Sequence, residues 1–350
     1  MLKKKQRKTI WKSLACVLST VCVLSMFPSC GSGECSHAWG EYEYNDTEHW
    51  REYTCGHTAP NNSSPHADDN GDGKCDDCAF EMKIPVSVGL EFVISDDGEK
   101  YAVKSIGSCA DTQIVIPDTY EGLPVVAIYM EAFKGNATIK SVVIPDTVTV
   151  VYDYAFMECS ALESVKFLGN GLKRIYFGAF LGCAGLKEIN LPNGLEVIYD
   201  HAFNGCASIT ELLIPDSVRM IQNWAFGNCA SLQSIAFPDA ITEIAESTCY
   251  GCASLKSVDF GSGVKNVWQN AFYGCIALER LYIPKNIIYL ASAFPACSSL
   301  NYIEFEITSG WKFCSGAFFN SVDVTNPGKN ASKLKGPGNG DGSWKREIDE

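Results

Sequence analysis

Hydrophobic and polar positions recur along this chain in a unit of 22 to 24 residues, from about residue 110 to about residue 320. The unit is clearest in Leu186–Cys206, where Ile189 and Leu191 alternate with polar residues and the pair Ala202-Phe203 follows. The large residue of that pair recurs at Phe133, Phe156, Phe180, Phe203, Phe226, Phe272, Phe294 and Phe318, with Cys249 in the place of one more phenylalanine. Self-similarity at such a period predicts a repeat solenoid.

Each unit is too short to enclose a core of its own, so its apolar face must be buried against the coils on either side. The alternation at Ile189 and Leu191 is the pattern of a half-buried strand. We therefore expect one strand in each coil, and strands that run in the same direction must pair in parallel. A proline would end the strand because it lacks a donor hydrogen. It recurs at Pro145, Pro192, Pro215, Pro238 and Pro284.

The repeated unit resembles the BspA-like branch of bacterial leucine-rich repeat proteins, in which a strand ending in proline is followed by Ala-Phe and then by cysteine. Residues Gly89–Val125 are similar to the cap and first coil of that family. The resemblance implies a leucine-rich repeat β-solenoid of parallel strands over residues 84–325, with an N-terminal cap. It also implies attachment to host matrix proteins, host cells or other bacteria. Residues 326–350 are rich in Gly, Lys, Asn and Ser, and they predict a flexible tail.

Residues 1–29 have the character of a secretory signal, since six basic residues precede an apolar run from Leu14 to Phe27. That run is short for a membrane span, which needs about 20 apolar residues. Phe27–Cys30 resembles a lipobox, in which the cysteine becomes the lipidated first residue of the mature protein. We expect export, with Cys30 as a lipid anchor at the outer face of the membrane. Ordinary cleavage near Gly31–Gly33, which would give a secreted protein, is the alternative.

A small Cys/His/Asp-rich module extends from residue 30 to residue 83. It is poor in apolar residues, so a bound metal or disulfides must hold any fold that it adopts. The donor types and short spacing of four residues match a structural zinc site, namely Cys55, His57, Cys75 and Cys78. The alternative is disulfide bonding among Cys35, Cys55, Cys75 and Cys78, which allows three pairings.

An acidic loop overlaps the second cysteine pair of this module. Carboxyl and amide oxygens recur there at the spacing of a calcium loop, in Asp68, Asn70, Asp72 and Asp76. Gly73 permits the sharp turn that such a loop needs, but Ala79 stands where an EF-hand has a bidentate glutamate. The loop therefore predicts a weak calcium site, or else an Asx-rich turn that binds no ion.

Cysteine occupies a fixed place three residues after the Ala-Phe pair of most coils. The members of this cysteine column are Cys159, Cys183, Cys206, Cys229, Cys252, Cys275 and Cys297. In-register coils place successive members about 5 Å apart, but their side chains point the same way, which is poor geometry for a disulfide. We expect these thiols to be reduced and buried as small hydrophobic groups.

An aromatic column follows the second apolar position of each coil. Its members are Tyr129, Tyr152, Tyr176, Tyr199, Gln222, Ala245, Trp268 and Ala291, so five of eight are Tyr or Trp. One ring per coil would form a continuous strip along the solenoid, and we predict that these five aromatic residues contact a ligand. The alternative is that the rings cover the edge of the core and stack for stability.

Charge and missing motifs narrow the function. Six of the 28 basic residues and none of the 41 acidic ones lie in the signal, which leaves 22 against 41 and a charge near −19. Such acidity argues against a nucleic-acid partner. No nucleophile is visibly paired with a base and no phosphate-binding glycine loop follows a strand, so we expect no catalysis.

The sequence thus favours a monomeric adhesion protein that binds a protein or glycan on host or bacterial surfaces. A second hypothesis is a glycan-capturing surface lipoprotein, and a third is a structural spacer without a specific ligand. The sequence names no ligand, because repeat surfaces exchange residues without changing the fold.

Overall fold

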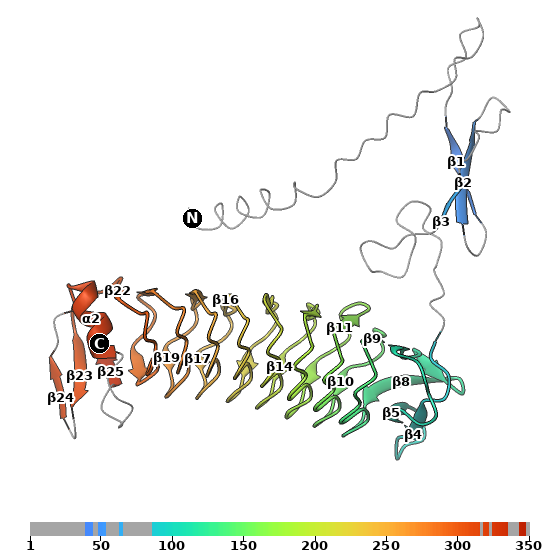
Figure 1. Ribbon diagram of the computed structural model, residues 1–350, viewed down its shortest axis with the longest axis horizontal. Helices are drawn as coiled ribbons and strands as arrows, with labels where there is room; N and C mark the ends of the chain where they lie inside the picture. The colour runs from blue at the N-terminus through green and yellow to red at the C-terminus, as the bar shows by residue number, and fades with distance from the viewer. Residues whose placement is uncertain are drawn as a thin grey trace, which may run out of the picture. The chain divides into compact units, whose positions relative to one another are not determined.

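The structure, a computed structural model, describes residues 39–44, 48–53, 63–65, 86–315, 318–321, 324–334 and 343–347. The chain divides into two compact units, Met1–His66 and Ala67–Glu350. The described part of the first unit is a three-stranded antiparallel sheet of β1 (Trp39–Tyr44), β2 (Glu48–Tyr53) and β3 (Ser63–Pro65), with β2 in the centre. The second unit is a solenoid of stacked coils (Figure 1).

The solenoid begins with a cap that covers the open end of its first coils. Strands β4 (Glu91–Ile94) and β5 (Tyr101–Ser105) form an antiparallel hairpin, and β5 then pairs in parallel with β8 (Leu123–Ile128). The short strand β7 (Thr119–Tyr120) pairs antiparallel with β8. The hairpin therefore supplies hydrogen-bond partners to an edge that would otherwise be a site for unwanted pairing.

Two columns of parallel strands run along the solenoid (Figure 1). The first consists of β6 (Gln113–Val115), β9 (Ser141–Ile144), β11 (Ser164–Phe167) and β13 (Glu188–Ile189), then the pair β16 (Ser234–Ala236) and β18 (Ser257–Asp259), and then the pair β20 (Arg280–Ile283) and β22 (Tyr302–Phe305). The second consists of β8, β10 (Val150–Val151), β12 (Arg174–Ile175), β14 (Val197–Ile198) and β15 (Met220–Ile221), then β17 (Glu243–Ile244), β19 (Asn266–Val267) and β21 (Tyr289–Ala291).

The second column corrects the expectation of one strand per coil, because most coils contain two. Apart from β8, the strands of the second column span only two or three residues each, and Val150, Arg174, Val197 and Met220 are matched across successive coils. Alternation cannot be recognised over so few positions, so the hydrophobic pattern gave no sign of these strands. The prolines end strands of the first column as expected, since β9 stops at Ile144 and β20 at Ile283.

The core is a stack of phenylalanine rings, one from each Ala-Phe pair. Rings in neighbouring coils lie 4.9 to 5.9 Å apart and nearly parallel from Phe133 to Phe226, and again between Phe272 and Phe294. All of these rings are fully buried. Cys249 interrupts the stack, and there Phe237 and Phe260 contact Phe272 edge-on instead. The predicted core residues are thus confirmed for the described coils.

The C-terminal segment corrects the expectation of a flexible tail over residues 326–350. It contains α2 (Pro327–Leu334) and β25 (Ser343–Arg346). Strand β25 pairs antiparallel with both β21 and β23 (Trp311–Ser315), and β23 also pairs with β24 (Phe318–Ser321). Phe318 therefore lies in an antiparallel strand and does not begin another coil.

Trp344 shows why this segment folds back onto the solenoid. Its side chain is fully buried and stacks on Phe305 with ring centroids 5.6 Å apart. In α2 the amide of Asn330 donates to the carbonyl oxygens of Ile303 and Val324, at 3.1 and 2.8 Å. An end coil without a neighbour would expose apolar surface and strand edges, and this segment covers both. Within the described residues, no helix is long and apolar enough to cross a membrane.

Candidate binding face

Four tyrosines form a continuous ladder beside the second column of strands. Successive ring centroids lie 6.0 Å apart from Tyr129 to Tyr152, 5.4 Å from Tyr152 to Tyr176 and 4.5 Å from Tyr176 to Tyr199. We call these four residues the tyrosine ladder. Tyr129 is 48% exposed, whereas the other three are half-buried. The ladder is therefore partly exposed.

The ring orientations decide which surface the tyrosine ladder offers. Tyr176 and Tyr199 are stacked with their planes only 11° apart, so each covers a face of the other. Burial, and after it the neighbouring phenol of Tyr199, raises the pKa of Tyr176. This stacked end of the ladder presents ring edges and hydroxyl groups to a partner and few free ring faces. At the other end, Tyr129 meets Tyr152 in a T-shaped contact with the ring planes 66° apart.

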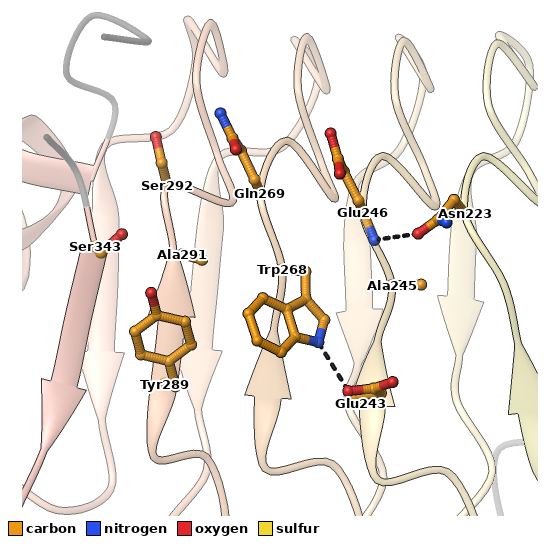
Figure 2. A pocket seen from close by; sticks show the side chains of 10 residues that line it. All are labelled: Asn223, Glu243, Ala245, Glu246, Trp268, Gln269, Tyr289, Ala291, Ser292 and Ser343. Atoms are coloured by element: carbon orange, nitrogen blue, oxygen red, sulfur yellow. Dashed lines mark hydrogen bonds between the residues drawn. The ribbon is translucent and has the colours of Figure 1, made fainter. Parts of the chain in front are cut away.

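The aromatic column becomes discontinuous after Tyr199, and a hollow of about 420 Å³ opens farther along it (Figure 2). It is lined by Asn223, Glu243, Ala245, Glu246, Trp268, Gln269, Tyr289, Ala291, Ser292 and Ser343. The indole N–H of Trp268 donates to Oε2 of Glu243 at 2.8 Å, and the ring meets Tyr289 edge-on at 5.6 Å. Asn223 accepts from the backbone N–H of Glu246 at 3.1 Å. Trp268, the last predicted contact residue, thus lies in a different setting from the tyrosine ladder.

A second run of rings crosses six coils, and the sequence did not reveal it. Its members, which we call the mixed ladder, are Tyr154, Phe177, His201, Trp224, Tyr250 and Tyr273. Successive centroids lie 4.5 to 5.7 Å apart, and every ring is half-buried. The rings come from three different places in the repeat, so no single column of the sequence contains them.

Backbone geometry explains part of the mixed ladder. Tyr154, His201 and Trp224 have φ values of 57°, 56° and 58°, a left-handed conformation that costs a non-glycine residue roughly 1–2 kcal/mol. Each of these residues donates its backbone N–H to a carbonyl of the next coil, at 2.9 to 3.1 Å. The coil-to-coil hydrogen bonds thus hold the strained turn. Where Gly178 takes this position, the preceding residue Phe177 supplies the ring.

His201 is the ionisable member of the mixed ladder. It lies between Phe177 and Trp224, with ring centroids 5.4 and 5.7 Å away. Its Nδ1 is 2.8 Å from the side-chain amide of Asn204. Burial lowers the pKa of His201, and the opposing effect of Asp200 is smaller. The neutral imidazole is therefore favoured in the folded protein.

The cysteine column is confirmed as buried and free of disulfides. Each thiol donates to a backbone carbonyl of the preceding coil, over 2.9 to 3.4 Å. Burial raises the pKa of Cys159 to about 12, and it also raises the pKa of Cys206. A neutral buried thiol is a poor nucleophile and metal ligand, so this column has a packing role.

The remaining predicted sites lie outside the described residues. They are the lipid anchor Cys30, the zinc candidates Cys55, His57, Cys75 and Cys78, and the calcium candidates Asp68, Asn70, Asp72 and Asp76. Across the part of the chain that the structure describes, no three His, Cys, Asp or Glu residues cluster closely enough to hold a metal ion.

Comparison with known proteins identifies a family model and several solved structures that are similar to this chain. The family model described as the BspA type leucine-rich repeat region matches six copies over residues 105–233 and 219–327. A search of curated proteins found no match. Among solved structures, a leucine-rich repeat protein from T. pallidum is 28% identical with a TM-score of 0.51, over 56% of this chain and 91% of that one.

Two further structures have lower scores. A leucine-rich repeat protein from Bacteroides ovatus is 22% identical with a TM-score of 0.48, covering 65% of this chain and 72% of that one. A leucine rich cell surface protein from Faecalibacterium prausnitzii is 21% identical with a TM-score of 0.29, covering 65% and 96%. The family model spans more than half of the chain, and the chain accordingly belongs to the BspA-type leucine-rich repeat family.

Proposed function

We propose that this protein is an exported surface protein that binds a partner by adhesion and does not catalyse a reaction. The observation that carries the proposal is the tyrosine ladder, four partly exposed rings spaced 4.5 to 6.0 Å apart beside one column of strands. An extended segment of a host or bacterial surface protein could contact several rings at once. Tyrosine suits such contacts because its ring buries apolar area while its hydroxyl forms a hydrogen bond.

The exposed edges of the rings define the partner that we propose. At Tyr176 and Tyr199, where the ring faces are stacked, the partner meets C–H edges and hydroxyls, which favours a peptide with apolar and hydrogen-bonding groups in alternation. The acidity of the chain favours a neutral or basic segment. Export through the signal in residues 1–29 and anchoring at Cys30 would present this face outside the cell. A zinc- or disulfide-stabilised module near the anchor is part of the same proposal, and metal analysis of the purified protein would test it.

Changing Tyr152, Tyr176 and Tyr199 together to Ser tests the tyrosine ladder. Binding to immobilised matrix proteins should fall at least tenfold, which corresponds to about 1.4 kcal/mol. Circular dichroism should show the same fold with a small loss of stability. Tyr250→Ser with Tyr273→Ser is the matched control, since these rings stack equally closely at 4.5 Å but belong to the mixed ladder.

Three outcomes are informative for this experiment. Loss of binding with the fold retained supports the proposal. A triple variant that melts early, with several kcal/mol of stability lost, would show that the ladder is structural. Absence of any binding by the unmodified protein to matrix proteins, cells and glycans would favour a spacer. The glycan-capturing hypothesis is a second candidate, because the hollow at Trp268 combines an unstacked indole with carboxylate, amide and hydroxyl groups.

A further inference from the structure

The hollow at Trp268 lies where alanines interrupt the aromatic column. Ala245 and Ala291 occupy the column positions on either side of Trp268, so no ring of its own column covers a face of the indole. In the tyrosine ladder, by contrast, Tyr176 and Tyr199 cover one another at 4.5 Å. Trp268 is 39% exposed, and its contact with Tyr289 is T-shaped, so no neighbouring ring is stacked on the indole. The hollow therefore offers an unstacked indole, whereas Tyr176 and Tyr199 cover each other's faces.

Ala245, Trp268 and Ala291 form an apolar strip, and hydrogen-bonding groups flank it on both sides (Figure 2). Glu243 and Tyr289 lie on one side of the row formed by Ala245, Trp268 and Ala291. Glu246, Gln269 and Ser292 lie on the other side, toward the turns of the coils (Figure 2). Carboxylates accept hydrogen bonds, while amide and hydroxyl groups also donate them, so the groups on the two sides of the row provide both donors and acceptors. The indole N–H of Trp268 holds the carboxylate of Glu243 in place at 2.8 Å.

The charges around the hollow favour a neutral ligand. Two carboxylates, Glu243 and Glu246, would repel phosphate or another anion. Lys345 is paired directly with Tyr289 across β21 and β25, and directly paired residues place their side chains on the same face of a sheet. A positive group thus lies on the same face of the sheet as Tyr289, and the hollow is less suited to a cation than its two carboxylates alone would suggest.

We propose that the hollow around Trp268 binds a sugar unit of a neutral glycan. A pyranose ring has an apolar C–H face that can lie on an indole and a rim of hydroxyls that both donate and accept. The apolar row of Ala245, Trp268 and Ala291 matches the C–H face of the sugar, and the polar groups on either side of the row match its hydroxyls. A volume of about 420 Å³ lies within the usual range of small-ligand sites, about 300–1,000 Å³. The inference rests on the proposed function only in taking the protein to be a binder, and it does not require the tyrosine ladder.

The test uses the exported full-length protein and a panel of neutral disaccharides (maltose, cellobiose, lactose and N-acetylchitobiose), with glucuronic acid and glucosamine as charged comparators. Binding is followed by calorimetry and by the indole ¹⁵N–H signal of Trp268, assigned by its loss in Trp268→Phe. At least one neutral disaccharide should shift that signal and bind more tightly than either charged sugar. Trp268→Ala should weaken this binding at least tenfold.

Ala245→Tyr provides a second variant that does not depend on removing the indole. It should restore a ring to the column, cover one face of Trp268 and abolish sugar binding while the fold persists. The Tyr152, Tyr176 and Tyr199 triple variant should bind the sugar unchanged, so failure of the ladder and failure of the hollow can be told apart. The proposal is overturned if no panel member shifts the Trp268 signal, if a charged comparator binds best, or if Ala245→Tyr binds as well as the unmodified protein.

Discussion

The thiol of Cys206 donates a hydrogen bond to the backbone carbonyl of Phe180, one coil earlier, over 3.2 Å. The same carbonyl also accepts the backbone N–H of Cys183, within its own coil, at 3.2 Å. A buried carbonyl has two lone pairs, and this arrangement satisfies both. The cysteine column therefore links each coil to the next, and its thiols are not available for redox chemistry.

Phe203→Ala should destabilise the solenoid by about 3–5 kcal/mol, because it removes a fully buried ring that packs between Phe180 and Phe226. Cys206→Ser should cost less, since the hydroxyl can donate to the same carbonyl and only the apolar character of sulfur is lost. Urea unfolding followed by circular dichroism measures both. Equal losses in the two variants would contradict the view that the phenylalanine stack dominates the core.

The column thiols should resist modification in the native protein. Burial raises the pKa of Cys183 and Cys206, so little thiolate forms at neutral pH and reagents have no access. Alkylation of native protein should miss Cys183, Cys206 and Cys229, whereas alkylation in denaturant without reductant should label all three. Mass spectrometry of the peptides gives the result. Disulfides between successive members of the column would refute the packing role.

His201 should make stability depend on pH in a defined direction. Its pKa in the folded protein is lowered from 6.5, so the unfolded chain binds the proton more readily. The contribution is complete above about pH 6.5 and is lost as the pH falls toward the lower folded pKa. Melting temperature should therefore decrease on acidification, and His201→Phe should reduce that decrease.

Phe at position 201 keeps a ring between Phe177 and Trp224 but cannot ionise, which makes it the matched comparison. Asp200→Asn is a second variant, and it should steepen the loss at low pH because Asp200 favours the charged imidazole. An unchanged pH profile in His201→Phe would assign the acid sensitivity to carboxylates elsewhere.

Trp344→Ala should destabilise the C-terminal end of the solenoid by about 3–5 kcal/mol, since the indole is fully buried against Phe305. Lys345→Ala, on the same strand but exposed, should have little effect and serves as the control. Hydrogen exchange should show that the loss is concentrated in β21, β23 and β25, because each coil of a solenoid interacts mainly with its neighbours. A uniform change along all coils would contradict this localisation.

Hydrophobic periodicity by itself determined the repeat, the parallel first strand of most coils and the phenylalanine core. These follow from local spacing, because every coil repeats the same short pattern and a stack of coils is the arrangement that buries it. The cysteine column was predictable for the same reason. The tyrosine ladder was also visible, since Tyr129, Tyr152, Tyr176 and Tyr199 occupy one equivalent position.

Contacts between coils decided the features that the hydrophobic pattern did not predict. The mixed ladder draws Tyr154, Phe177 and Tyr250 from three different positions of the repeat, so only the superposition of coils brings the rings together. Trp344 lies in a polar, glycine-rich segment that reads as a tail, yet the uncovered end of the last coil supplies its binding surface. The hollow at Trp268 depends on alanines about 23 residues away on either side. A linear pattern records none of these, because each depends on surface that exists only once neighbouring coils have stacked.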